Sequence, residues 1–177
     1  EQRDMAVVEE SQEEYAKSKA GQLKEVCAVF GVKDVRILPF SDNPLEVTNQ
    51  VVEALAETLY EVRPQMVLTH APYTLPDRRF NLAWANDHTA TGIAVQKAMQ
   101  RVDIPDPKGG QAPHRVAAVY YLANDYAYHE ADICIDIADQ VANRKKAEML
   151  FESQGHTPEF AEKRVESAVG YQGWKAR

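Results

Sequence analysis

The feature that most constrains the fold is an apolar run that ends at a histidine and is followed, one loop later, by a helix start. Residues 66–69 lack the polar alternation of a half-exposed strand, and such a run is typical of a strand covered on both faces. Arg63-Pro64 ends the helical pattern before the run. Asp87-His88 begins the helical pattern after it. This order predicts an α/β fold with a mostly parallel sheet.

Helical and strand patterns alternate along the whole chain. Apolar residues at helical spacing predict helices at about 4–30, 45–62, 88–101, 139–153 and 158–169. Short apolar runs predict further strands at 35–40, 116–121 and 133–137. Gly31 is expected to cap the first helix. Residues 104–113 are rich in Pro and Gly and are interpreted as an exposed loop, so we expect a single domain over residues 1–177.

The composition excludes several classes of function. The chain has 20 Lys+Arg and 27 Asp+Glu, and its net charge of −7 disfavours a nucleic acid partner. It contains no apolar run near the roughly 20 residues of a membrane span. Cys27 and Cys134 are expected to be small buried hydrophobic residues rather than a disulfide or a metal site. We therefore expect a cytoplasmic protein with a small-molecule substrate, and a homo-oligomer.

Among the five histidines, His88 has the most informative surroundings. If Asp87 is the N-cap, its carboxylate accepts backbone N–H groups and His88 points from the helix start toward the strand ends. The positive end of a helix favours the neutral imidazole, which is the form that binds metal ions. The alternative is that Asp87 is only a cap and His88 a surface histidine. The residues alone leave both interpretations open.

Other polar residues are candidates for the same pocket. His70 follows the apolar run, and it either is satisfied by hydrogen bonds at the strand end or belongs to the site. Tyr126 and His129 lie in a polar aromatic segment that lines a pocket mouth or forms a partly buried loop. His114 is expected on the surface. His156 is interpreted as a loop or interface residue.

Several ordered motifs resemble the LmbE-like or PIG-L family of zinc-dependent N-acetylglucosaminyl deacetylases. The motifs are Phe30-Gly-Val32, Arg63-Pro-Gln-Met-Val-Leu-Thr-His70, Asp87-His-Thr-Ala-Thr-Gly92, Asp136-Ile137, Lys145-Lys-Ala-Glu-Met-Leu150 and Ser153-Gln154. The resemblance implies a Rossmann-like three-layer αβα fold and a single zinc ion held partly by His88. With it, we expect Asp87 and His70 to take part in catalysis and Tyr126, His129 and Arg78 to bind substrate.

The chain also departs from this family. The family's His-Pro-Asp-Asp motif, which supplies two zinc ligands and the general base, is absent from these 177 residues. The position three residues before His88, often a histidine in the family, is Ala85. We expect that the domain is truncated at its N-terminus, that the remaining ligands lie upstream of Glu1, and that the C-terminus is a candidate for truncation as well.

Two alternative functions follow from the same residues. The tail, with Gly155-His156, Arg164 and Trp174, is similar to the branch of the family that contains 4-oxalomesaconate hydratase, in which Arg164, Lys163 or Arg78 would pair with substrate carboxylates. Surface ion pairs are the other interpretation of these residues. The second alternative is a non-catalytic binding module that has lost the metal site. The leading hypothesis is a zinc-dependent hydrolase that removes an acetyl group from an N-acylated sugar-like substrate.

Overall fold

The structure is a computed structural model that describes residues 12–41, 44–72, 87–107, 109–122, 132–151 and 154–175. The chain divides into two compact units. The central unit comprises Leu38–Ala131, and the terminal unit comprises Glu1–Ile37 together with Asp132–Arg177. Among the described helices, none is both long and apolar enough to cross a membrane. The expectation of one domain stays a prediction.

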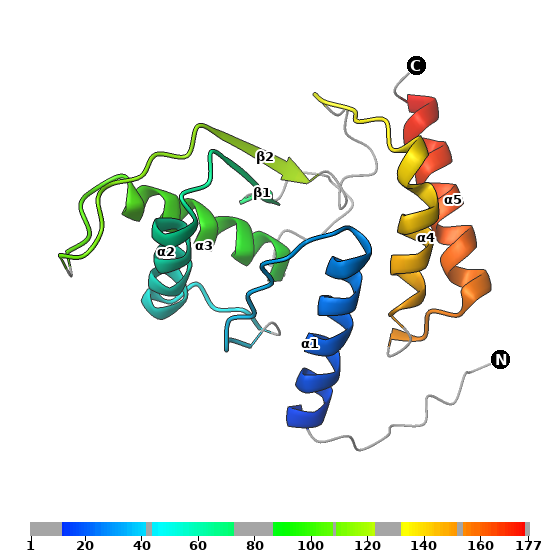
Figure 1. Ribbon diagram of the computed structural model, residues 1–177, viewed down its shortest axis with the longest axis horizontal. Helices are drawn as coiled ribbons and strands as arrows, with labels where there is room; N and C mark the ends of the chain where they lie inside the picture. The colour runs from blue at the N-terminus through cyan, green and yellow to red at the C-terminus, as the bar shows by residue number, and fades with distance from the viewer. Residues whose placement is uncertain are drawn as a thin grey trace, which may run out of the picture. The chain divides into compact units, whose positions relative to one another are not determined.

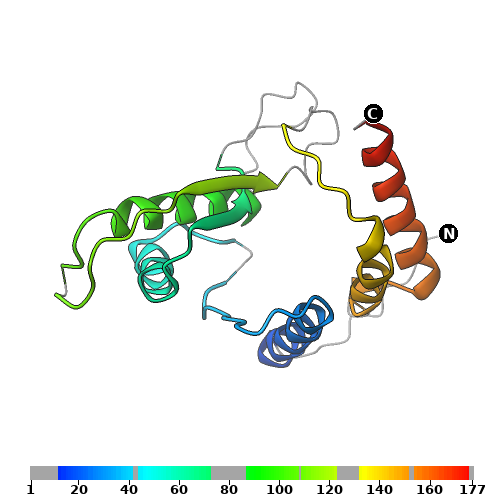
Figure 2. The same ribbon diagram turned by 45° about the horizontal axis from the view of Figure 1, so that its top comes forward.

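Two parallel strands joined by a helix form the centre of the central unit. β1 (Met66–His70) pairs with β2 (Ala118–Leu122) in parallel, from Met66 opposite Ala118 to His70 opposite Leu122. Helix α3 (Asp87–Val102) connects them and packs on β1 (Figure 1). Both arrows run in the same direction along α3 in Figure 2. The predicted α/β class with a parallel sheet is confirmed by this pairing. Helix α3 provides the crossover connection that parallel neighbours need.

Helix α2 (Asn49–Val62) packs on α3 and completes the helical part of this unit. The side chain of Thr48 caps its start by accepting a hydrogen bond from the backbone N of Val51 at 3.3 Å. The shared core is formed by buried residues of both helices: Ala56, Tyr60, Ala98 and Val102. The two alanines let the helix axes approach closely, since they place no bulk at the contact.

The end of α2 is fixed by Arg63, which has a left-handed backbone with φ of 49°. Its guanidinium donates to the carbonyl oxygens of Ala112 at 3.0 Å and Pro113 at 2.9 Å. His114 Nε2 lies 2.7 Å from the carbonyl oxygen of Pro64. These contacts tie the loop before β2 to the start of β1. His114 is half-buried, so its prediction as a surface residue was wrong.

The sheet of the central unit has one covered and one exposed face. Thr69 is buried, and Tyr121, opposite it on β2, has its hydroxyl 2.6 Å from Gln96 Nε2 of α3. Successive side chains of a strand alternate between faces, and Met66 and Leu68, on the other face, are 60% and 62% exposed. The prediction that both faces of this strand are covered was therefore wrong for the described residues. An apolar run marks a face suited to burial, but burial requires a second layer.

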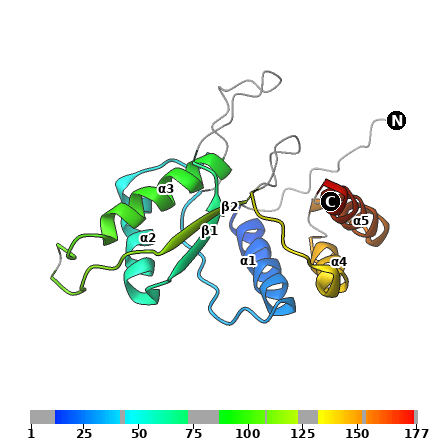
Figure 3. The same ribbon diagram turned by 90° about the horizontal axis from the view of Figure 1, so that it is seen from above.

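The secondary structure described in the terminal unit is helical. Its helices are α1 (Gln12–Val29), the short 3-10 helix η1 (Ala138–Gln140), α4 (Val141–Met149) and α5 (Pro158–Lys175). Both α1 and α5 pack on α4, and α4 and α5 lie side by side in Figure 3. Buried alanines at 147 and 161, with Val165, make the α4–α5 contact close.

The predicted cap of α1 is confirmed. Gly31 has φ of 71°, and the backbone N of Val32 donates to the carbonyl oxygen of Cys27 at 3.0 Å. A second bond joins the backbone N of Gly31 to the carbonyl oxygen of Ala28 at 3.0 Å. This pair of bonds is the Schellman arrangement, in which glycine takes the left-handed position without steric cost.

A buried carboxylate holds the α4–α5 hairpin together. The side chain of Glu148 is only 2% exposed, and it contacts Arg144 at 3.0 Å, Arg164 at 3.1 Å and His156 Nδ1 at 3.1 Å. The ring of His156 also packs beside Phe160, with centroids 4.9 Å apart. A buried carboxylate needs such partners, because desolvation without them is costly.

Two predicted strands and one cysteine differ from expectation. Residues 35–40 and 133–137 are described and are not in strands. Their apolar pattern marks the capacity to form a strand, but a strand also needs a hydrogen-bonded neighbour. Cys134 is exposed and Cys27 half-buried, so the prediction of two buried cysteines was wrong for Cys134. It lies on the segment that failed to form a strand.

Candidate metal-binding site

The candidate site lies where the carboxyl end of β1 meets the first turn of α3. His70 is the last residue of β1, and His88 follows Asp87 in the first turn of the helix. In open α/β sheets, ligands bind outside the carboxyl ends of the strands. The two segments that carry the predicted histidines therefore meet at the position where this fold class binds ligands.

Gly92 allows this close meeting. A Cβ atom at residue 92 would lie 2.5 Å from the carbonyl oxygen of His70 and 2.7 Å and 2.8 Å from the carbonyl carbon and oxygen of Ala71. Backbone atoms cannot yield as the tip of a flexible side chain can, so only glycine fits here. His88 and Gly92 are one helical turn apart and share a face of α3, so the approach at Gly92 also brings His88 to the strand end.

The imidazole rings of His70 and His88 stack. Their centroids are 4.2 Å apart and their planes differ by 16°. The side chain of His88 is 41% exposed, so part of this ring is open to solvent and to a ligand. The prediction that His70 and His88 share one site is thus matched by the geometry, while their chemical roles stay predictions.

Asp87 lies beside the metal-ligand candidate. Its Oδ2 is 3.9 Å from His88 Nε2, and its side chain is 47% exposed. Helix α3 begins at Asp87 itself, one residue before the predicted start. The hydroxyl of Thr91 donates to the carbonyl oxygen of Asp87 at 2.8 Å and reinforces this first turn. The acidic residue stands at the positive end of the helix, where negative charge is favoured.

These residues fit a zinc ion in kind but not in number. Imidazole nitrogen and carboxylate oxygen are both ordinary zinc ligands, and a catalytic site uses three protein ligands. Over the described part of the chain, no group of three or more His, Cys, Asp or Glu is arranged to hold a metal ion. His88 and Asp87 are candidates for such a site, which would need at least one further ligand from outside this group of described residues.

Three predicted substrate-binding residues fall outside the described residues. They are Arg78, Tyr126 and His129, and Ala85 falls there too. Arg164 and His156, which the tail motif singled out, are described. Both contact the buried carboxylate of Glu148 in the terminal unit. Arg164 therefore forms an ion pair, and a role of Arg164 toward substrate stays a prediction.

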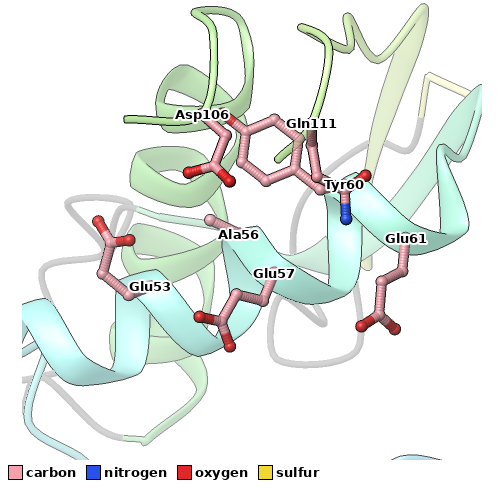
Figure 4. A pocket seen from close by; sticks show the side chains of 7 residues that line it. All are labelled: Glu53, Ala56, Glu57, Tyr60, Glu61, Asp106 and Gln111. Carbon is pink, nitrogen blue, oxygen red and sulfur yellow. The ribbon is translucent and has the colours of Figure 1, made fainter. Parts of the chain in front are cut away.

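A small cavity in the central unit lies apart from these histidines. Its volume is about 90 Å³, and it is lined by Glu53, Ala56, Glu57, Tyr60, Glu61, Asp106 and Gln111 (Figure 4). Ligand pockets usually measure roughly 300–1,000 Å³. Glu53 is already paired with Arg101 at 2.9 Å, and the hydroxyl of Tyr60 donates to the carbonyl oxygen of Ile104 at 2.8 Å. This cavity is therefore a gap in helix and loop packing rather than a substrate site.

Sequence reasoning underestimated Gly92. The sequence identifies it only as the last residue of the Asp87–Gly92 motif, and its close approach to β1 was not predicted. The sequence did contain a signal. Glycine inside a helix lowers helix stability by about 1 kcal/mol relative to alanine. A glycine one turn after a candidate ligand therefore indicates that another segment approaches the helix closely there.

Comparison with known proteins gives consistent matches. The model of the GlcNAc-PI de-N-acetylase family, PIG-L, matches residues 1–99. Diacetylchitobiose deacetylase from Thermococcus kodakarensis is 26% identical over 151 residues, which cover 82% of this chain and 53% of that protein. A probable N-acetyl-alpha-D-glucosaminyl L-malate deacetylase 2 from Bacillus cereus is 31% identical over 83 residues, 46% of this chain and 34% of that protein.

A solved structure matches the fold. The N,N'-diacetylchitobiose deacetylase from Pyrococcus horikoshii has a TM-score of 0.73 and 22% sequence identity, and the match covers 97% of this chain and 64% of that one. At this identity the likeness concerns the fold. The chain spans about half the length of the Thermococcus kodakarensis relative and about a third of the Bacillus cereus relative.

Proposed function

This chain belongs to the PIG-L family of GlcNAc-PI de-N-acetylases, and we propose that its protein is a zinc-dependent deacetylase acting on an N-acetylated amino sugar. In the proposed reaction, water adds across the amide bond. The water oxygen joins the acetyl carbon, the C–N bond breaks, and the sugar nitrogen takes a proton and leaves as an amine, with acetate as the second product.

One observation carries the proposal. His88 stands in the first turn of α3, partly open to solvent, and its ring stacks on His70 at the carboxyl end of β1. A surface histidine without function needs no such approach of helix to strand, and the glycine at 92 that permits the approach weakens an isolated helix. The arrangement is better explained by a requirement to hold His88 in place.

The residues of this chain would share the work as follows. His88 would be a zinc ligand in its neutral form, and Asp87, with Oδ2 3.9 Å from His88 Nε2, would help to orient its ring. A zinc ion bound there would lower the pKa of a coordinated water molecule to about 7 and would polarise the acetyl carbonyl. His70 lines the same wall of the site. Arg78, Tyr126 and His129 remain our candidates for contacts to the sugar.

The substrate class rests on the relatives. The matched proteins from Thermococcus kodakarensis and Bacillus cereus are described as deacetylases of diacetylchitobiose and of N-acetyl-alpha-D-glucosaminyl L-malate. The two substrates share an acetamido group on a glucosamine ring, and we assign that group to this protein. The hydratase alternative draws on His156 and Arg164, which hold Glu148 instead, so we favour deacetylation.

We also propose an architecture, an assembly, a compartment and a class of partner for the whole protein. The exposed apolar face at Met66 and Leu68 suits a further layer, as in a three-layer αβα fold, or a second copy in a homo-oligomer. Two free cysteines, one exposed, suit a reducing cytoplasm. The net charge of −7 argues against nucleic acid, so the partner we propose is a small molecule.

The test uses the full-length protein with N,N'-diacetylchitobiose and measures acetate release and zinc content together. We expect about one bound zinc per chain for the wild type and a loss of at least about 100-fold in both zinc affinity and turnover for His88→Ala. His114→Gln is the control, since it removes a histidine outside the site but keeps a donor toward Pro64.

The proposal would be refuted if His88→Ala kept the zinc content and the activity of the wild type. A well-folded full-length protein that binds no zinc and releases no acetate would favour the non-catalytic binding module.

A further inference from the structure

We propose that His70 is a positioning residue that fixes the ring of His88 for metal binding, and that Gly92 is the spacer that makes this contact possible. The inference rests on the proposed function, because it gives His70 a role only if His88 binds a metal ion. His70 was expected from the sequence to take part in catalysis. In this inference it instead acts by holding the ring of His88.

The stacking geometry excludes His70 as a co-ligand of the same ion. An imidazole nitrogen binds a metal within the plane of its ring, at about 2.0–2.1 Å. The two rings are nearly parallel, with centroids 4.2 Å apart. An ion equidistant from both would therefore stand well out of each ring plane, where neither nitrogen presents its lone pair. In this arrangement one ring can bind the ion and the other can only support it.

A stacked neighbour restricts the motion that a ligand histidine would otherwise have. His88 lies in a terminal helical turn and its side chain is 41% exposed, so burial alone does not fix the rotamer of its ring. The flat face of His70 restrains the plane of the ring and leaves its edge, where the nitrogens lie, available. His70 itself is fixed to the sheet, since it is paired in register with Leu122 of β2.

Gly92 sets the distance between the two rings. His88 and Gly92 occupy the same face of α3, one turn apart, and the glycine rests on the backbone of His70 and Ala71. A methyl group at residue 92 would lie 2.5 Å from the carbonyl oxygen of His70, so the helix would have to move outward. That shift would separate the rings without altering either histidine.

The first measurement is metal affinity of the full-length protein, by Co²⁺ titration followed in the visible spectrum. We expect His70→Ala to weaken Co²⁺ binding by about 10–100-fold, as for other residues that orient metal ligands. His70→Phe should stay within about threefold of the wild type, because a phenyl ring preserves the stack but cannot bind metal. Gly92→Ala should resemble His70→Ala.

The second measurement needs no metal. In the metal-free protein, the ring protons of His88 lie over the ring of His70 and should carry its ring-current shift in NMR spectra. We expect this shift to be lost in His70→Ala and in Gly92→Ala and kept in His70→Phe. If Gly92→Ala fails to fold, the two His70 variants still decide the question.

The outcomes separate this inference from the proposed function. Equal loss of Co²⁺ affinity in His70→Ala and His70→Phe would identify His70 as a ligand and overturn the inference alone. Unchanged affinity in His70→Ala, with turnover reduced, would identify it as a catalytic group and also overturn it. A wild-type protein that binds no Co²⁺ would overturn the proposed function and, with it, any role of His70 toward a metal.

Discussion

Replacing Glu148 with glutamine should cost the terminal unit a large part of its stability. The substitution Glu148→Gln keeps the shape of the side chain but removes the charge that Arg144, Arg164 and His156 face. A hydrogen bond to a charged group contributes about 1.5–3 kcal/mol when buried, and only the contact to His156, which is 9% exposed, has that burial.

The two arginine contacts count for less. Arg144 and Arg164 are 43% and 52% exposed, and exposed ion pairs contribute about 0.2–1 kcal/mol each. The sum is a loss of about 2–5 kcal/mol in the free energy of unfolding. Against a total of about 5–15 kcal/mol for an ordinary domain, this is a large fraction.

The assay is urea unfolding of the full-length protein, followed by circular dichroism and by hydrogen exchange of the amides in α4 and α5. The matched control is Glu162→Gln on the same hairpin, where the carboxylate is 58% exposed and pairs with Lys145 at 3.1 Å. We expect faster exchange in both helices for Glu148→Gln and almost none of that effect for the control. Equal and small effects of the two variants would refute the reasoning that burial, rather than pairing alone, makes Glu148 important.

Two further predictions concern other fixed points of the fold. Arg63→Ala should lower the free energy of unfolding by about 1–2 kcal/mol, because two backbone carbonyls in the loop before β2 lose their donor. Arg63→Gly should recover about 1 kcal/mol of this loss, because glycine adopts the left-handed backbone without strain. A lower melting temperature for the glycine variant than for the alanine variant would contradict this. Hydrogen bonds that Lys145 Nζ donates to Glu166 and then to Glu162 raise the pKa of Lys145 above its ordinary 10.5, so its stabilising effect is present below that pH and is lost as the pH rises above it. Urea midpoints of the wild type should therefore fall more steeply than those of Lys145→Met between about pH 9 and pH 11.5, and parallel slopes would argue against the assignment.

The central unit was largely predictable because local pattern and tertiary contact agree there. The apolar run after Arg63-Pro64 became β1, the Asp87-His88 start opened α3, and the apolar run near 118 became β2. Each element is specified by its own residues, namely a helix stop before β1, an acidic first turn in α3 and the apolar runs of the two strands. Their order of strand, helix and strand supplies the crossover that parallel pairing needs.

The parts that failed depend on partners that the sequence does not name. Residues 35–40 and 133–137 have strand-like apolar patterns but are not in strands, since pairing is a property of two segments and not of one. The contact of Gly92 with the backbone of His70 likewise exists only after folding. The stack of His70 on His88 could be suspected from the fold class, but its geometry could not.

The contact between Arg164 and His156 determines which nitrogen of the imidazole carries its hydrogen. Arginine can only donate, and its Nη1 lies 3.3 Å from His156 Nε2, so Nε2 accepts. Nδ1 then carries the hydrogen and donates to Glu148. In this tautomer the hydrogen bonds run in one direction, from the guanidinium of Arg164 through the imidazole to the carboxylate of Glu148. A lysine at 156 would oppose Arg164, and an aspartate would oppose Glu148. The position accepts only a side chain with an acceptor on one side and a donor on the other.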